Sequence, residues 1–309
     1  MIDVVVIAGP TATGKTKLSV ELAKRFNGEI VNADSMQIYK EMDIGTAKPT
    51  AEEMGGIPHR LMGFVDPLDS FSVKEYVELA HESVREIHGL GKLPIIVGGT
   101  GMYINSLVDC VAFNDLKPDP AVTARLEKTL AESGPQGLFD ELKRIDPELA
   151  SQLHPNNQRR VFRALELYYL TGELPTKIRK EAVEQPRIYR PLILAADFER
   201  QELYNRIDRR VRDMLDNGLL DEVKKVRELG CTLDCQSMQG IGYKEVFPYL
   251  DGTISYDELY ECICRNTRRY AKRQLTWFRR DKRVLWQEGG FDIEHCCSLV
   301  KEFITKAGE

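Results

Sequence analysis

The N-terminal segment, residues 3–26, constrains the fold of this chain more than any other feature. Residues 3–8 begin with Asp3 and continue as a short apolar run, which predicts a strand buried on both faces. Residues 9–16 read Gly-Pro-Thr-Ala-Thr-Gly-Lys-Thr, and apolar side chains at helical spacing follow in residues 17–26. A Gly-x-x-x-x-Gly-Lys-Thr loop between a strand and a helix is the context that identifies a phosphate-binding loop. The segment therefore predicts a di- or triphosphate site.

Each part of this loop has a physical role in binding phosphate. The glycines let backbone N–H groups turn toward an anion, and the N-terminus of the following helix adds its positive end. Lys15 supplies a compact charge, and the Thr16 hydroxyl is placed to ligate Mg²⁺. The predicted pyrophosphate-binding residues here are Gly9, Pro10, Thr11, Ala12, Thr13, Gly14, Lys15 and Thr16. The alternative interpretation is a glycine-rich turn that binds nothing.

Strands and helices alternate over the first hundred residues. Short strands are predicted at residues 30–34 and 93–97, and an amphipathic helix at 73–88. This alternation is typical of an α/β fold, a parallel sheet with helices on both faces. Another apolar strand is predicted at 192–196, whereas the last third of the chain is expected to be mostly helical.

Between these strands lies a segment with helical patterns only. Asp119 and Pro120 predict a helix start and Gly134 a stop, and a helix over 158–170 ends at Gly172. We therefore expect an all-helical insertion at 115–188 in a phosphate-loop α/β core made of residues 1–114 and 189–309.

Charge is distributed unevenly along the chain. The net charge is −5, yet residues 265–283 hold nine Lys or Arg and a single acid, Asp281. Such a band on an acidic chain suits contact with nucleic-acid phosphates, although a solvated helix face is the common alternative. Tyr270 and Trp277 lie on an apolar stripe of the same stretch that we expect to pack in the core.

The sequence also argues against several classes of protein. The longest apolar runs, 4–8 and 191–196, are too short to span a bilayer, and no basic stretch precedes an apolar N-terminal region. The seven cysteines include no Cys-x-x-Cys pair, so reduced thiols are expected and a zinc site is not. A soluble cytoplasmic protein without a membrane partner is the expectation.

The usual features of an ATP-hydrolysing site are weak. The strand at 95–97 runs into Gly-Gly-Thr-Gly without a carboxylate, and the acid instead follows the second strand, at Asp34. Small-molecule kinases can also place an acid there, so a kinase remains an open alternative.

Six segments of the chain resemble segments of one known family. They are residues 9–16, 32–49 (Asn-Ala-Asp-Ser-Met-Gln-Ile-Tyr-Lys-Glu-Met-Asp-Ile-Gly-Thr-Ala-Lys-Pro), 97–103 (Val-Gly-Gly-Thr-Gly-Met-Tyr), 158–166 (Gln-Arg-Arg-Val-Phe-Arg-Ala-Leu-Glu), 240–244 (Gly-Ile-Gly-Tyr-Lys) and 267–278 (Thr-Arg-Arg-Tyr-Ala-Lys-Arg-Gln-Leu-Thr-Trp-Phe). In them the chain resembles the tRNA dimethylallyltransferases, also called tRNA isopentenyltransferases. The C-terminal zinc finger of some eukaryotic members is not present, so the bacterial form is expected. The family often has a second His after His59 and an Asp in place of Gly63, and we assign that loop no function.

The resemblance implies a reaction and its residues. The enzyme would transfer a dimethylallyl group from dimethylallyl pyrophosphate to N6 of adenosine 37 in the tRNA anticodon loop, with Mg²⁺ as cofactor. Asp34 would accept the proton of the amine and Thr100 would position the base; turn-forming residues are the alternative interpretation of both. Arg206 and Arg210 match pyrophosphate-contacting arginines, although they could instead lie on an ordinary surface helix.

The adenine must leave its stack to reach such a site, which requires a surface that binds single-stranded RNA. The residues that the resemblance assigns to tRNA binding are Asp34, Ser35, Met36, Gln37, Gln158, Arg159, Arg160, Val161, Phe162, Gly240, Tyr243, Lys244, Lys272, Arg273, Gln274, Trp277 and Arg279. The helical insertion would contact the anticodon stem-loop, and the protein is expected to be a monomer.

Two competing functions are considered. An ATP-dependent small-molecule or nucleoside kinase would explain the phosphate loop but would not need the insertion or the basic band at 265–283. A non-catalytic RNA-binding module that uses a nucleotide as a switch would leave Asp34 and Thr100 without a role.

Overall fold

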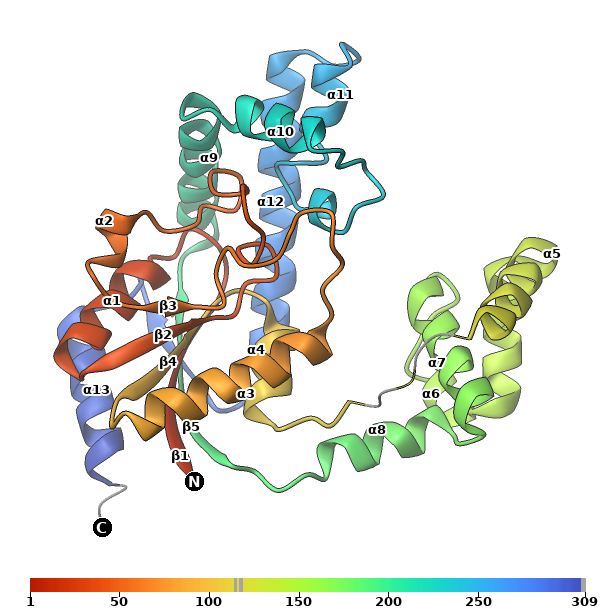
Figure 1. Cartoon of the computed structure of the whole chain (residues 1–309), viewed down its shortest axis with the longest axis horizontal. Coiled ribbons are helices and arrows are strands. Elements are labelled where there is room, and N and C mark those ends of the chain that lie inside the picture. The colour runs from red at the N-terminus through yellow and green to blue at the C-terminus, as the bar shows by residue number, and fades with distance from the viewer. Residues whose placement is uncertain (114–115, 117–118, 307–309) are drawn as a thin grey trace. The chain divides into compact units, whose positions relative to one another are not determined.

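The computed structural model describes residues 1–113, 116 and 119–306. The chain forms two compact units: unit 1 comprises Met1–Val108 and Arg187–Glu309, and unit 2 is Asp109–Pro186 (Figure 1). The sequence predicted a helical insertion at 115–188, and its predicted boundary residues 114 and 115 lie outside the described residues.

Unit 1 is built on a six-stranded sheet in the order β3-β2-β4-β1-β5-β6, in which every pair of neighbours is parallel. The strands are β1 (Ile2–Ala8), β2 (Gly28–Asn32), β3 (His59–Arg60), β4 (Leu93–Val97), β5 (Tyr189–Asp197) and β6 (Val284–Glu288). This confirms the predicted parallel sheet, whose central strands are apolar because both of their faces are covered. All strands point the same way, so the loops after β1, β2 and β4 meet at one edge.

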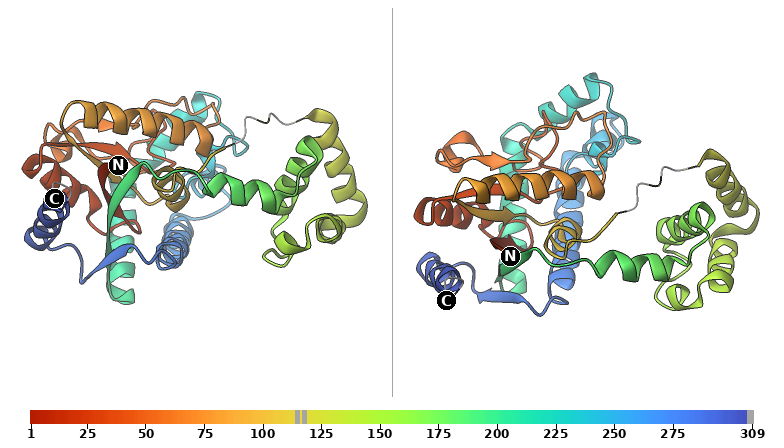
Figure 2. Two further views of the ribbon diagram at one scale, coloured as in Figure 1. Left: turned by 90° about the horizontal axis from the view of Figure 1, so that it is seen from below. Right: turned by 60° about the horizontal axis from the view of Figure 1, so that its bottom comes forward.

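The helices of unit 1 are α1 (Lys15–Arg25), α2 (Ala51–Met54), α3 (Val73–Gly89), α4 (Gly101–Val108), α9 (Arg200–Asp216), α10 (Leu219–Glu228), α11 (Val246–Leu250), α12 (Tyr256–Phe278) and α13 (Ile293–Thr305). The side chains of Val5 and Ile7 join a core with α1 and α13. α3 and α4 pack against β2, β4 and β1 (Figure 2). α9 and α12 pack against each other and lie near the edge of the sheet at which the loops after the strands meet.

Unit 2 contains only helices among its described residues: α5 (Pro120–Ile145), α6 (Pro147–Ala150), α7 (Gln158–Thr171) and α8 (Pro175–Val183). As predicted, Asp119 caps α5 through the N–H of Ala121 at 2.8 Å, and α5 breaks at Gly134. A separate core, which includes Leu126, Leu142 and Leu165, holds these helices together.

The last third of the chain is mostly helical, as expected, but it also contains the edge strand β6, which was not predicted. β6 is short, and only Val284 and Gln287 in it are buried, so it gives a weak sequence signal. One expectation for this region was wrong. Trp277 does not pack in the core: it is 36% exposed, and its Nε1 donates a hydrogen bond to Asn105 Oδ1 at 2.9 Å. Tyr270 is only half-buried because it lines the cavity described below.

Among the described residues, no helix combines the length and the apolar character needed to cross a lipid bilayer.

One buried carboxylate links three neighbouring strands. Glu29 on β2 accepts hydrogen bonds from Arg60 Nε on β3 (3.0 Å) and from Lys92 Nζ just before β4 (2.7 Å). Burial alone would raise the pKa of Glu29, but these two cations outweigh it and lower that pKa below the ordinary 4.5.

We expect Glu29→Gln to lower the free energy of unfolding by about 2 kcal/mol at pH 7, because Lys92 loses its counter-charge and Arg60 keeps only its ion pair with the exposed Glu86. Since the folded-state pKa is depressed, the stabilisation by Glu29 is fully present above the ordinary carboxyl pKa and is lost as pH falls through the lower folded-state value. Urea unfolding of both proteins from pH 7 to pH 3 measures this. A difference that stays constant down to pH 3 would show that the charge of Glu29 does not stabilise the sheet.

Candidate active site

The loop between β1 and α1 has the backbone conformation of an anion cradle. Gly9 (φ 121°) and Gly14 (φ 84°) adopt left-handed conformations that suit glycine, and Ala12 does so as well (φ 65°). The Thr13 hydroxyl donates to the Pro10 carbonyl at 2.9 Å, which closes the loop on itself. Gly14 caps α1, whose first backbone N–H groups and positive dipole end therefore face the space enclosed by the loop.

Two cationic side chains face this loop from different elements. Lys15 Nζ donates to the Pro10 carbonyl oxygen at 2.6 Å, and burial, followed by the charge of Arg210, lowers the pKa of Lys15 to about 8. Arg210 comes from α9, and its Nε is buried with no hydrogen-bond partner among the described residues. Burial also lowers the pKa of Arg210, whereas the charges of Asp34 and Glu53 oppose that shift. Two buried cations beside one loop favour the binding of an anion there.

These groups line a cavity of about 510 Å³ at the loop edge of the sheet. It is lined by the phosphate loop from Thr11 to Thr16, by the segments 34–49 and 239–244, and by α9 and α12. The predicted site residues that line the cavity are Thr11, Ala12, Thr13, Gly14, Lys15, Thr16, Arg210, Asp34, Ser35, Met36, Gln37, Gly240, Tyr243, Lys244, Arg273 and Gln274. The fold therefore brings together residues separated by up to 263 positions in the chain.

Asp34 sits in a tight turn directly after β2. Its Oδ1 accepts from the backbone N–H of Met36 (2.9 Å) and of Gln37 (3.4 Å), which fixes the rotamer. Its Oδ2 has no hydrogen-bond partner within residues 1–113, 116 and 119–306. One carboxylate oxygen is thus used to hold the turn, and the other is free for a ligand in the cavity.

Thr100 follows β4 and contacts this turn without being one of the cavity-lining residues. Its Oγ1 accepts from the Ser35 N–H at 2.9 Å and donates to the Ser35 hydroxyl at 3.1 Å. The loops carrying Asp34 and Thr100 are in close contact, since a Cβ on Gly98 would lie 2.1 Å from the Ala33 carbonyl oxygen. Any influence of Thr100 on a bound molecule is therefore exerted through its neighbours that line the cavity, Ser35 and Tyr270.

Gln274 joins the same centre from α12. Its Nε2 donates to the Gly99 carbonyl at 2.8 Å, and its buried Oε1 has no partner among the described residues. Tyr270, one turn earlier, also lines the cavity, and burial followed by the charge of Asp34 raises the pKa of Tyr270 to about 12. Its phenol is therefore protonated at neutral pH.

Other predicted residues lie outside the cavity. Arg206 is exposed, pairs with Glu202 at 2.9 Å and stacks over Phe198, so its interpretation as a pyrophosphate ligand has no support in this structure. Arg279 pairs with Asp197 at 3.1 Å, and Lys272 is exposed on α12. Gln158, Arg159, Arg160, Val161 and Phe162 open α7 in unit 2.

Sequence reasoning missed the apolar wall of the cavity. Ile207, Val211 and Met214 on α9 line it together with Arg210. Their spacing along the helix was visible in the sequence, but the same spacing is typical of ordinary core packing. It also missed Glu222 on α10, which holds a loop of the cavity by hydrogen bonds to backbone groups that no side-chain pattern reveals.

Comparisons with known proteins agree with the fold and identify the family. Residues 37–281 match the family described as IPP transferase. The chain is 50% identical over 282 residues to a protein of Halalkalibacterium halodurans named tRNA dimethylallyltransferase, covering 91% of this chain and 90% of the relative.

Solved structures give the same result. The crystal structure of a full-length tRNA isopentenylpyrophosphate transferase from Bacillus halodurans is similar with a TM-score of 0.73 at 46% identity, covering 99% of this chain and 96% of that one. A eukaryotic dimethylallyltransferase, solved in structures that show it acting on tRNA, is similar with a TM-score of 0.85 at 32% identity, covering 99% of this chain and 80% of that one. The chain therefore belongs to the IPP transferase family.

Proposed function

We propose that this chain transfers a dimethylallyl group from dimethylallyl pyrophosphate to N6 of adenosine 37 in tRNA and releases pyrophosphate. The observation that carries the proposal is a single cavity with an anion cradle at one end and the free oxygen of Asp34 beside it. The relatives named as tRNA dimethylallyltransferases support prenyl transfer to tRNA.

The phosphate loop would bind the diphosphate of the donor. Charge builds on the diphosphate oxygens as the allylic C–O bond breaks and the bonding electrons leave with pyrophosphate. The loop N–H groups, Lys15 and Arg210 would stabilise that charge in the transition state. Since Arg206 lies outside the cavity, we assign this role to Arg210 alone of the two arginines.

The mouth of the loop also fits Mg²⁺. Thr16 lines the cavity with a hydroxyl oxygen, a hard ligand of the kind that Mg²⁺ accepts alongside water and phosphate. When bound, Mg²⁺ would neutralise charge on the diphosphate. No group of three or more His, Cys, Asp or Glu side chains suited to a metal occurs among the described residues, so most ligands would come from water and substrate.

Asp34 would act on the acceptor. The N6 amine of adenine is a poor nucleophile because its lone pair is delocalised into the ring. As N6 bonds to the allylic carbon, one N–H proton would pass to the free carboxylate oxygen of Asp34. The apolar wall of Ile207, Val211 and Met214 suits the hydrocarbon of the donor and would exclude water that could capture it.

The remaining parts of the proposal concern tRNA. Arg273 and Lys244 line the cavity, and the exposed Lys272 precedes Arg273 in the sequence, as a basic surface for an RNA loop requires. We propose that unit 2 contacts the anticodon stem through the start of α7, and that the chain acts as a monomer in the cytoplasm.

Purified protein with Mg²⁺ is expected to transfer labelled prenyl from dimethylallyl pyrophosphate to tRNA without ATP, because the diphosphate ester is itself the activated donor. Scintillation counting of precipitated tRNA measures the transfer. Labelling that appears only when ATP is added would support the kinase alternative.

Asp34→Asn should lower the single-turnover rate by about 10²- to 10⁴-fold, the usual contribution of a general base. Asparagine keeps an oxygen for the Met36 N–H but cannot accept the proton, so donor affinity should change little. Rapid quench with prebound donor gives the rate, and Asp69→Asn, an exposed loop carboxylate, is the matched control. A rate equal to that of the wild type would remove Asp34 from the mechanism.

Donor binding should depend on the protonation of Lys15. Its pKa of about 8 in the free protein means that the ammonium, which binds the anion, is lost as pH rises above 8. Affinity for an unreactive donor analogue should therefore be highest below pH 8 and fall by up to about tenfold per pH unit above it.

Lys15→Met should bind the analogue about 10- to 100-fold more weakly at pH 7 and lose the additional fall above pH 8. Calorimetric titration from pH 6.5 to 9.5 measures both proteins, and Lys24→Met on the exposed end of α1 controls for net charge. Identical pH profiles for Lys15→Met and the wild type would assign the dependence to another group.

A further inference from the structure

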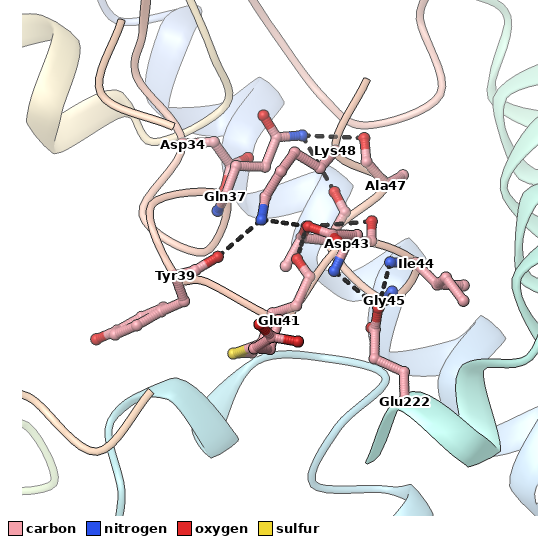
Figure 3. A network of polar contacts seen from close by, with 12 residues as sticks. Asp34, Gln37, Tyr39, Glu41, Asp43, Ile44, Gly45, Ala47, Lys48 and Glu222 are labelled. Carbon is pink, nitrogen blue, oxygen red and sulfur yellow. Dashed lines mark hydrogen bonds and ion pairs between the residues drawn. The ribbon is translucent and has the colours of Figure 1, made fainter. Parts of the chain in front are cut away.

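A single carboxylate holds the loop at residues 42–48 from outside the cavity. Glu222 on α10 accepts hydrogen bonds from the consecutive backbone N–H groups of Asp43 (2.7 Å), Ile44 (2.7 Å) and Gly45 (2.9 Å) (Figure 3). Three N–H groups converging on one carboxylate are a strong, charge-assisted arrangement. The position of this loop relative to α10 is therefore fixed through its backbone.

Tyr243 completes the arrangement. Its hydroxyl donates to Glu222 Oε1 at 2.5 Å, and its ring is fully buried. The ring packs so closely on the loop that a Cβ on Gly45 would lie 2.5 Å from Tyr243 Cε2. Burial, followed by the charge of Glu222, raises the pKa of Tyr243 well above its ordinary value, so the phenol stays a donor at every physiological pH.

The loop would not hold this shape by itself. Glu41 (φ 58°) and Ala47 (φ 46°) adopt left-handed conformations that cost about 1 kcal/mol each for residues with a side chain. Lys48 also stabilises the loop: it donates a hydrogen bond to the Tyr39 carbonyl at 2.8 Å and forms an ion pair with Asp43 (Figure 3). Such a conformation persists only where the surroundings impose it, and Glu222 provides three of the hydrogen bonds that do so.

Within the cavity, the position of loop 42–48 determines the hydrogen bonds of the Gln37 side chain. Its Nε2 donates to the carbonyl oxygens of Thr46 and Ala47, both at 3.1 Å (Figure 3). Both hydrogens of the Gln37 amide are therefore used in hydrogen bonds to the loop. The side chain lines the cavity, and its Oε1 has no partner in the described part of the chain. Gln37 thus offers a ligand an acceptor and no donor.

We infer that Glu222 is a positioning residue for the nucleobase: by fixing loop 42–48 it sets the orientation of the Gln37 amide, so that the cavity presents the Gln37 oxygen to an N–H donor of the substrate. The neighbouring free oxygen of Asp34 is a second acceptor on the same turn. Two acceptors side by side favour an amino group over a carbonyl oxygen. This inference rests on the proposed function, and it states how the cavity selects the base that accepts the prenyl group.

A purely structural role for Glu222 would give a different result from a positioning role. A structural residue stabilises the protein, and its loss would lower the folded fraction and affect both substrates alike. A positioning residue that acts through Gln37 would weaken only the tRNA side, and its effect would vanish once Gln37 no longer has an amide to orient.

The test is a double-mutant cycle with Glu222→Gln and Gln37→Met in the full-length chain. Glutamine at 222 keeps the shape but turns an NH₂ toward backbone donors. Each single variant should lower kcat/KM for tRNA by about tenfold, with the KM for dimethylallyl pyrophosphate within about twofold of wild type. The double variant should be no more than about twofold worse than Gln37→Met alone. Glu228→Gln, exposed on the same helix, is the matched control.

Amide hydrogen exchange supplies a readout that does not depend on activity. The N–H groups of residues 43–45 should exchange faster in Glu222→Gln, whereas those of β1 and β4 should not. If Glu222→Gln does not fold, Glu222→Asp, which shortens the reach by one methylene, replaces it in the same cycle.

Three outcomes would overturn the inference: losses in the double variant that multiply, an equal effect on both substrates, or an unchanged kcat/KM for tRNA in Glu222→Gln. Failure of the proposed function is distinct, because the wild type itself would then transfer no prenyl group. In that case the same cycle, measured as equilibrium binding of an anticodon stem-loop RNA, decides the inference: additive losses refute it.

Discussion

Burying a cation without a counter-ion is costly, and this chain does so at the edge of its sheet. Lys15 and Arg210 come from helices far apart in the sequence and face one cavity, where Asp34 and Glu53 compensate them only in part. The cost is tolerable because a ligand can supply the missing negative charge. The other elements around the cavity serve this arrangement. The parallel sheet positions the phosphate loop, α9 carries Arg210, and α12 lines the cavity.

The cavity combines three environments that would conflict if they were mixed. The phosphate loop offers positive charge, the α9 face carrying Ile207 and Val211 is apolar, and the turn at Asp34 offers acceptors. They are kept apart because each belongs to a different element. At the Asp34 turn, one carboxylate oxygen binds the backbone of the turn, and the other has no hydrogen-bond partner within the described residues.

Much of the fold could be predicted from local patterns. The phosphate loop, the apolar strands and the capped start of α5 at Asp119 all depend on neighbours in sequence, so their signals are short and strong. β6 could not be found because an edge strand has no continuous apolar run.

The site was predictable where a residue's role depends on its own loop, as for Lys15 and Asp34. Arg206 and Arg210 were indistinguishable in sequence, since only the packing of α9 decides which one faces the cavity. Trp277 was misplaced in the core because its stripe continues that of Leu259, while its indole instead reaches Asn105 at the surface. Glu222 gave no signal, since its partners are backbone amides.

The contact between Gly98 and Ala33 has an implication for redesign. Even a methyl group at Gly98 would collide with the Ala33 carbonyl oxygen, so the strand ends that carry the Asp34 turn and the Thr100 turn can meet only with glycine at this position. Under the proposed function, substitutions meant to admit bulkier donors therefore belong on the α9 wall, where Met214 lines the cavity with an unbranched, adaptable side chain.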